Sequence, residues 1–227
     1  MDEIQQIPVH NKEKEGRPKQ TRRGFNPKDT SLFSGEQGDS LIKAIEEVTF
    51  LLDRNYSKEG SITFVGNHRR LTDRQRLALL RIVCSTEQRK LRREKSVKCE
   101  RLNQSILFID GFNIIITMET ILSSSLILRG SDGIIRDLAG VRGTYRIIAV
   151  TEKAIRFILS SLEAHHVHEA IFLLDAPVSN SGRLAAFIRT LSSSYHLKVS
   201  VEVRGDVDTY LQGQDLIPIF PPEFYMV

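Results

Sequence analysis

The chain of 227 residues contains 41% hydrophobic and 26% charged residues, which is enough apolar surface for one large domain or two small ones. Its two cysteines exclude a disulfide-stabilised scaffold, and its net charge of +4 indicates no class of partner by itself. The first residues are charged, and no apolar run approaches the ~20 residues of a membrane span. We therefore expect a soluble, cytoplasmic protein with no membrane partner.

Residues 1–37 are polar and show no periodicity, with seven basic and six acidic residues. Segments that contain so few large apolar side chains do not fold on their own. We therefore predict a flexible, disordered polar tail over residues 1–37.

Residues 38–103 have the pattern of a small helical domain. Apolar side chains recur at three- and four-residue steps from Leu41 to Leu52, which indicates an amphipathic helix. Thr72 followed by Gln75 has the spacing of a capping box and predicts the start of another helix.

The charge of the chain is concentrated in this helical region. Residues 69–101 contain twelve Lys and Arg but four Asp and Glu, a net of +8, so the chain outside this block and the tail carries −5. A basic helical surface can neutralise the phosphates of RNA, and we expect Arg74 and Arg81 to contribute to it. The alternative is a solvated helix surface without a binding role.

Residues 104–227 alternate apolar runs with amphipathic stretches. SILFID (105–110), AIFLLD (170–175) and residues 197–204 have the pattern of buried or half-buried strands, as do LILRG (126–130) and TYRIIAV (144–150). Helix-like segments lie between them. This alternation predicts an α/β domain with a mostly parallel sheet flanked by helices.

Two of these predicted strands end in an aspartate, Asp110 and Asp175. In an open α/β sheet, ligands bind beyond the carboxyl ends of the strands. Two carboxylates about 4 Å apart would repel by roughly 4 kcal/mol at an effective dielectric constant of ~20, and a divalent cation would remove that repulsion. Oxygen ligands favour Mg²⁺ or Mn²⁺. We expect Asp137, or Asp132 as the second choice, to complete the metal site, and Asn113 to position Asp110.

Several polar residues beside these acids are candidates for phosphate binding. Arg136 and Arg142 lie in a glycine-rich loop with Asp132 and Asp137, a composition that suits phosphate binding assisted by a metal. The turn after Asp175 offers an anion cradle at a helix start, with the alternative of an ordinary helix cap. Its residues are Ser179, Asn180, Ser181 and Arg183.

Two family resemblances follow from these motifs. DGFN after an apolar strand, with a second strand-end aspartate downstream, resembles the PIN/NYN class of metal-dependent ribonucleases. The segments LTDRQRLALLR, IDGFNIIIT, LRGSDGIIRDLAGVRGTYR and LLDAPVSNSGRL are similar, in that order, to the archaeal and bacterial domain-of-unknown-function family numbered 434. That resemblance covers about Ser40 to Arg204 and implies a helical N-terminal part and a PIN-like C-terminal part.

The PIN/NYN resemblance implies a Mg²⁺- or Mn²⁺-dependent nuclease that cleaves RNA. It matches Asp110 and Asn113 to the first acidic element of the class and Asp175 to a later one. Two other hypotheses stay open: a non-catalytic nucleic-acid or nucleotide-binding module of the same shape, and a phosphoesterase for small substrates.

Overall fold

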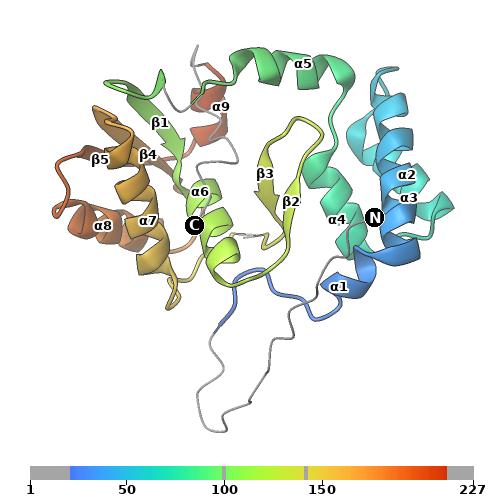
Figure 1. Ribbon diagram of the computed structural model, residues 1–227, viewed down its shortest axis with the longest axis horizontal. Coiled ribbons are helices and arrows are strands. Elements are labelled where there is room, and N and C mark those ends of the chain that lie inside the picture. Colours follow the sequence, from blue (N-terminus) through green and yellow to red (C-terminus); the bar gives the residue numbers. More distant parts are fainter. Residues whose placement is uncertain (1–20, 99–100, 141–142, 214–227) are drawn as a thin grey trace, which may run out of the picture.

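The computed structural model describes residues 21–98, 101–140 and 143–213, in which a helical part is followed by an α/β part (Figure 1). The helical part packs around a core of aliphatic side chains that includes Leu41, Val48, Val65 and Leu79. It consists of α1 (Asp29–Leu32), α2 (Gly35–Leu52), α3 (Lys58–His68), α4 (Asp73–Ile82) and α5 (Thr86–Lys95).

Helix α4 begins where the capping-box spacing predicted. The side chain of Thr72 accepts a hydrogen bond from the amide of Gln75, and the side chain of Gln75 accepts one from the amide of Thr72. Each side chain therefore satisfies a backbone group that the first helical turn leaves unpaired. Ser85 and Gln88 form a second capping box at the start of α5.

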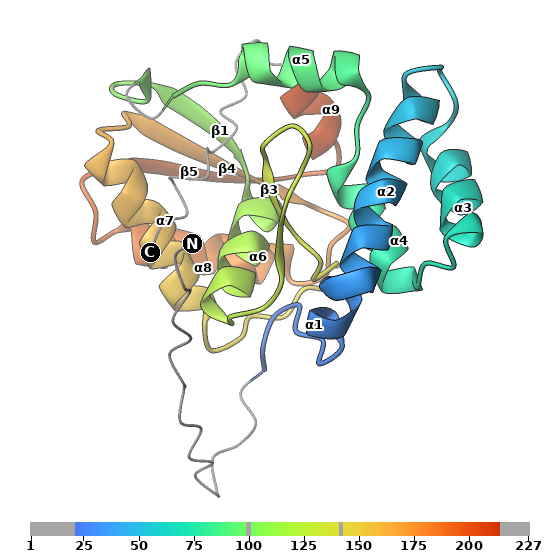
Figure 2. The same cartoon turned by 45° about the vertical axis from the view of Figure 1, so that its right-hand side comes forward.

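The α/β part is built on a parallel three-stranded sheet in the order β1-β4-β5. Helices α6, α7 and α8 share a buried core with one face of this sheet, and α9 packs on the other face (Figure 2). The elements are β1 (Ile106–Asp110), α6 (Gly111–Leu122), β2 (Ile127–Arg129), β3 (Ile135–Asp137), α7 (Thr151–Ala164), β4 (Glu169–Asp175), α8 (Ser181–Ser192), β5 (Lys198–Arg204) and α9 (Val207–Gln212).

The segment between α6 and α7 differs from the expected run of parallel strands. Strands β2 and β3 form a separate antiparallel hairpin, and Leu128 of this hairpin packs on the core of the helical part. Of the predicted strand 144–150, the structure shows a single bridge between Thr144 and Ser179. Tyr145 is fully buried while its neighbours are exposed, and Arg23 and Asn180 donate to the carbonyl oxygens of Arg146 and Tyr145, so this segment is held by one buried ring and single hydrogen bonds rather than by a ladder of backbone hydrogen bonds.

The prediction of a flexible tail over residues 1–37 is wrong for residues 21–37. Arg23 donates a hydrogen bond to Glu119 of α6 at 2.7 Å, and Arg22 donates to the carbonyl groups of Ser123 and Ser124. The Glu119 side chain is completely buried, so a charge-bearing partner is needed to offset its desolvation. The segment that precedes α1 is fixed because it supplies that partner. Residues 1–20 of the predicted tail lie outside the described residues.

Helix α5 crosses the molecule between the two parts with no buried side chain of its own (Figures 1 and 2). The contacts that hold it are polar, chiefly Thr86 to Asp53 and Arg92 to Asp132. None of the helices in the described ranges combines the length and apolar character needed to cross a bilayer.

Candidate acidic site at the carboxyl edge of the sheet

Asp110 and Asp175 lie at the same edge of the sheet, as the strand pattern predicted. Strands β1 and β4 are parallel neighbours, and Asp110 is in register with Leu173, two residues before Asp175. Two residues along a strand and one strand spacing across separate their Cα atoms by roughly 8 Å. The alternation of side chains places both aspartates on the face of the sheet that packs on α9, because Phe108 and Leu173 contact that helix.

Local structure fixes the orientation of Asp110. It is the N-cap of α6: one carboxylate oxygen accepts from the amide of Asn113 at 3.0 Å, and the other accepts from the side-chain amide of Asn113. Gly111 is required here because a Cβ atom would lie 2.6 Å from the side chain of Leu174 and 3.2 Å from the carbonyl oxygen of Leu173. The Asp-Gly-Phe-Asn motif therefore brings α6 close to β4 and holds the Asp110 carboxylate by two hydrogen bonds.

The carboxylates at this edge repel one another. Burial raises the pKa of Asp110, and the negative charges of Asp175 and Asp208 raise it further, while the hydrogen bonds from Asn113 oppose that rise. Burial also raises the pKa of Asp175, with a second contribution from Asp208. Three carboxylates thus share this edge of the sheet, and a bound cation would relieve their mutual repulsion.

Asp208 is the third member of this group, and the sequence analysis did not include it among the site residues. It lies in the first turn of α9, directly after β5. Because β5 is parallel to β4, the residues that follow it reach the same edge as Asp110 and Asp175. Ligands bind beyond the carboxyl ends of the strands in an open α/β sheet, and applying this rule to β5 would have identified Asp208.

Contacts beside Asp208 fix α9 on the sheet. Arg204 forms ion pairs with Asp206 at 2.9 Å and with Glu202 at 3.2 Å, and its guanidinium group stacks on the ring of Tyr210. The same tyrosine ring meets Phe108 of β1 edge-on. Arg204 is thus engaged by Asp206 and Glu202, and within the described ranges it forms no ion pair with Asp110 or Asp175.

The described side chains of the acidic site do not form a complete set of ligands for a metal ion. Within the described residues, no three His, Cys, Asp or Glu side chains lie close enough to enclose an ion by themselves. Mg²⁺ commonly binds one or two carboxylates and completes its coordination with water and substrate oxygens. Asp110 and Asp175 match that requirement without a complete set of protein ligands.

Asp137 and Asp132, the predicted additional metal ligands, lie elsewhere and are engaged in ion pairs. Asp137 is buried and accepts from Arg81 of α4, from Thr117 of α6 and from the amide of Ala139. Thr117 is seven residues beyond Asp110, or about 10 Å along α6 at 1.5 Å per residue. Asp137 therefore links the hairpin to two helices and does not join the carboxylates at the sheet edge.

Asp132, in the turn between β2 and β3, also connects separate elements through ion pairs. It forms ion pairs with Arg136 at 2.7 Å and with Arg92 of α5 at 2.6 Å. Burial acts to raise the pKa of Asp132, but the hydrogen bonds and charge of Arg136, with those of Arg92, lower it to about 2. A side chain on Gly130 would collide with both Arg136 and Asp132, so the glycine of this loop makes room for the pair.

Most of the arginines predicted to bind phosphate are bound to acceptors within the chain. Arg74 binds both carboxylate oxygens of Asp29, at 2.9 and 2.8 Å, and the carbonyl oxygens of Leu138 and Gly24. Arg81 binds Asp137 as described, and Arg136 binds Asp132. Of these arginines, Arg81 reaches Asp137 across the boundary between the helical and α/β parts, and Arg74 reaches the carbonyl oxygen of Leu138 across it, so both stabilise the docking of the two parts. Arg142 lies outside the described residues.

The turn after β4 has the form of a helix start. Asn180 adopts a left-handed conformation with φ of 68°, and its side-chain amide donates to the carbonyl oxygen of Tyr145 at 2.7 Å. The amides of Ser179 and Ser181 donate to carbonyl oxygens of Gly143 and Val178. Because these two amides are used in backbone hydrogen bonds, fewer donors remain to bind an anion at the predicted cradle. Arg183 is exposed near the start of α8.

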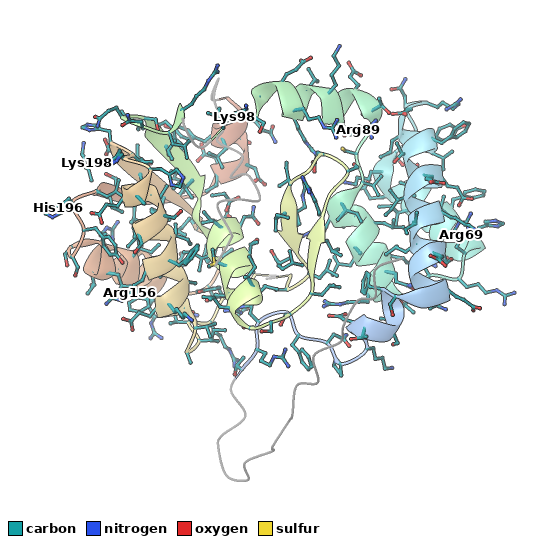
Figure 3. All side chains as sticks on the ribbon, in the orientation of Figure 1. Arg69, Arg89, Lys98, Arg156, His196 and Lys198 are labelled. Atoms are coloured by element: carbon teal, nitrogen blue, oxygen red, sulfur yellow. The ribbon has the colours of Figure 1, made fainter. Side chains whose placement is uncertain are left out.

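Helix α5 and the residues that follow it carry a group of cations without close acidic partners. In the described part of the chain, no carboxylate within ion-pair distance is found for Arg89, Arg93, Lys95 or Lys98, and Lys90 has a loose pair with Glu94 at 4.0 Å. Figure 3 shows Arg89 on α5 and Lys98 beyond its C-terminal end. Both ribbon views place this helix on the same side of the molecule as α9 (Figures 1 and 2).

Comparisons with known proteins match both parts of the chain. The family described as "Domain of unknown function (DUF5616)" matches residues 99–219, which hold the acidic site. This chain belongs to the DUF5616 family. The family described as "Protein of unknown function (DUF434)" matches residues 40–95, so the resemblance to family 434 holds for the helical part, and the remainder of the expected range falls under DUF5616.

One relative matches most of the chain. The "Uncharacterized protein MJ0935" of Methanocaldococcus jannaschii is 32% identical to this DUF5616 member over 178 residues, which are 78% of this chain and 85% of the relative. No solved structure matches the chain.

Proposed function

We propose that this DUF5616 protein is a Mg²⁺- or Mn²⁺-dependent nuclease that cleaves RNA at the carboxyl edge of its parallel sheet. The observation that carries the proposal is the group of Asp110, Asp175 and Asp208 at one edge of the sheet, where burial, together with the charges of neighbouring carboxylates, raises the pKa of the first two. Groups with pKa values perturbed by burial and by like charges cluster at functional sites. The PIN-like character of the domain is part of this proposal.

In this proposal the side chains have distinct roles. Asp110 and Asp175 hold the ion, Asn113 orients the Asp110 carboxylate through its two hydrogen bonds, and Asp208 adds a third negative charge. When bound there, a divalent ion would supply positive charge beside the scissile phosphate and would lower the pKa of a water molecule. The cations of α5 bind the phosphates of the RNA on either side of the cleaved bond.

Replacement of Asp110 with asparagine tests the proposal. Asparagine is as good an N-cap as aspartate, so α6 keeps its start, while the loss of one charge relieves the repulsion. We expect Asp110→Asn to abolish Mn²⁺-dependent cleavage of labelled single-stranded and structured RNAs, and to melt at the same temperature as wild type or higher. Mn²⁺ should raise the melting temperature of the wild-type chain but not that of the variant.

The matched control is Asp206→Asn. Asp206 lies two residues from Asp208, but it is exposed and paired with Arg204. The Asp206→Asn variant should therefore cleave RNA as well as the wild-type chain does. Cleavage that survives Asp110→Asn, or that persists in EDTA, contradicts the proposed function.

A non-catalytic RNA-binding module is the second candidate. One observation favours it: the described side chains do not enclose an ion by themselves, whereas the basic surface of α5 is already formed. Binding of the same RNAs without cleavage, at equal affinity with Mn²⁺ and with EDTA, would establish this alternative. Turnover of a small phosphoester but of none of the RNAs would instead identify the third hypothesis, a phosphoesterase.

A further inference from the structure

Helix α5 carries a row of cations on one face. Arg89, Lys90 and Arg93, here called the α5 row, lie within an arc of about 100° around the helix axis, because each residue turns the helix by about 100°. Arg89 and Arg93 are about one turn apart, or about 6 Å along the axis. With Thr86 and Glu94 these side chains line a hollow of about 350 Å³. The helix therefore offers several charged donors around a single depression.

The charge of the α5 row is only weakly offset within the described part of the chain. No carboxylate there lies within ion-pair distance of Arg89 or Arg93, and the pair of Lys90 with Glu94 is 4.0 Å long. Both side chains of that pair are largely exposed, at 78% and 58%, and exposed pairs of this kind contribute little. Phosphate groups of a nucleic acid would supply the missing counter-charges.

Contacts at its start and in its middle hold α5 in place. The amide and the hydroxyl group of Thr86 donate to the two carboxylate oxygens of Asp53, at 2.7 and 2.8 Å. These bonds lower the pKa of Asp53, with a smaller contribution from the charge of Arg89. In the middle of the helix, Arg92 binds Asp132 at 2.6 Å. The α5 row is thus arranged before a ligand arrives, which reduces the cost of ordering it on binding.

The basic segment of residues 69–101 contains no Phe, Tyr or Trp. Proteins that bind single-stranded nucleic acid combine a basic groove with aromatic rings on which the bases stack. Double-stranded RNA is instead bound through its phosphates and 2′-hydroxyl groups, by shape rather than by sequence. The α5 row has the chemistry of the second kind of surface.

The aromatic rings beside the acidic site are engaged with protein partners. Tyr210 of α9 meets Phe108 edge-on, with 5.6 Å between the ring centroids, and the guanidinium carbon of Arg204 lies 3.9 Å from the centroid of the Tyr210 ring. These contacts occupy rings that a single strand would need for stacking at the acidic site.

The exposed rings of α2 and α3 lie apart from the α5 row. Phe50 and Phe64 are 54% and 69% exposed, at the edge of the molecule away from the sheet (Figures 1 and 2). Glu46 and Glu47 line the hollow between these rings, and their carboxylates repel phosphate groups. Tyr56, in the turn before α3, lines a hollow with Phe64 and not the hollow of the α5 row. The α5 row is therefore a basic surface without a stacking platform.

We propose that the α5 row binds the phosphates of base-paired RNA, so that the substrate of the acidic site is a structured RNA rather than a single strand. The inference rests on the proposed function for the place of cleavage. A duplex holds its phosphates at regular spacings on a stiff frame, which suits cations that a helix holds at fixed positions. Both ribbon views place α5 and α9 on the same side of the molecule, and one RNA reaches both (Figures 1 and 2). Because the row contacts phosphates and not bases, binding is independent of sequence.

Binding measured in EDTA tests the inference without cleavage. Fluorescence anisotropy with the full chain compares an RNA duplex of about 16 base pairs, the length that one double-stranded RNA-binding domain spans, with each of its separate strands. We expect the duplex to bind at least ~10-fold more tightly than either strand, and a second duplex of unrelated sequence to bind equally well.

Replacing Arg89 and Arg93 together with glutamine removes two cations of the row. The affinity of this double variant for the duplex should fall on the order of 10-fold. Its melting temperature should stay that of wild type, because neither side chain forms an ion pair within the described residues. Lys43→Gln combined with Lys153→Gln is the matched control: it removes two exposed lysines, from α2 and α7, and should leave the affinity unchanged.

Strands that bind as tightly as the duplex overturn the inference, and so does a double arginine variant that binds the duplex like wild type. A chain that binds neither form of RNA overturns it too. The proposed function has its own readout, the Mn²⁺-dependent cleavage that Asp110→Asn abolishes. Such cleavage without a preference for the duplex would refute the inference alone. Duplex binding without cleavage would refute the nuclease and support the α5 row as a duplex-binding surface.

Discussion

Replacement of Asp132 with asparagine should destabilise the folded chain by roughly 2–3 kcal/mol at pH 7 without affecting RNA cleavage. The Asp132 side chain is completely buried and binds both Arg136 and Arg92, while burial itself acts to raise its pKa. The net result is a pKa of about 2, compared with 3.8 for the free side chain. A difference of nearly two units, at about 1.4 kcal/mol each, gives the expected loss of stability.

The pH dependence of this effect follows from the direction of the shift. Because the pKa is lowered by folding, the carboxylate stabilises the folded chain fully above pH 4–5, and this contribution is lost as the pH falls toward 2. Asparagine carries no charge at any pH. The difference in stability between wild type and Asp132→Asn should therefore be largest near neutral pH and should shrink between about pH 4 and pH 2.

Urea unfolding followed by far-UV circular dichroism at several pH values measures this difference. At pH 7 the melting temperature of the variant should fall by roughly 5–10 °C. Equal destabilisation at pH 7 and pH 2.5 would refute the electrostatic explanation. Loss of RNA cleavage by a variant that is still folded would show instead that Asp132 belongs to the catalytic site. Asp110→Asn is the natural comparison, since it should have the opposite effects on stability and on cleavage.

Two further predictions concern the N-terminal segment and α5. Arg23→Ala leaves the buried Glu119 without its charged partner, so the free energy of unfolding in urea should fall by about 3–5 kcal/mol; a loss below 1 kcal/mol would contradict this role. Replacing Arg89, Lys90 and Arg93 with glutamine should weaken RNA binding and reduce the slope of log affinity against log salt by about 2, as measured in the Asp110→Asn background. An unchanged slope would place the RNA on another surface.

The features that sequence analysis predicted correctly depend either on contacts within one helical turn or on the general rule that strands alternating with helices pair in parallel. Thr72 and Gln75 form a capping box because both partners lie within one helical turn. Asp110 and Asp175 come together because strands that alternate with helices pair in parallel and therefore end at one edge. The same rule covers Asp208, which was missed because it follows a strand by four residues instead of ending it.

The features that sequence analysis did not predict depend on the docking of the two parts. Arg81 and Asp137 are 56 residues apart, and Arg23 and Glu119 are 96 apart. Counting charges along the chain gives a basic block and an acidic remainder but does not show which charges neutralise one another. In the structure two cations of that block, Arg81 and Arg92, are paired with acids of the α/β part, and Arg69 and Arg74 are paired with acids of the helical part, so a charge excess along the sequence is a poor measure of the charge available to a partner.

The N-terminal segment also determines how this protein can be divided. The boundary between the two matched families, at residues 95–99, suggests two separable modules. A fragment of residues 99–219 would nevertheless keep Glu119 in its interior without Arg23, and a fragment of residues 40–95 would keep Arg74 without Asp29. Residues 21–29 serve both halves at once. The unit that folds is therefore residues 21–29 together with both matched regions, and a C-terminal fragment would need a peptide carrying Arg22 and Arg23, added in trans, to complete its fold.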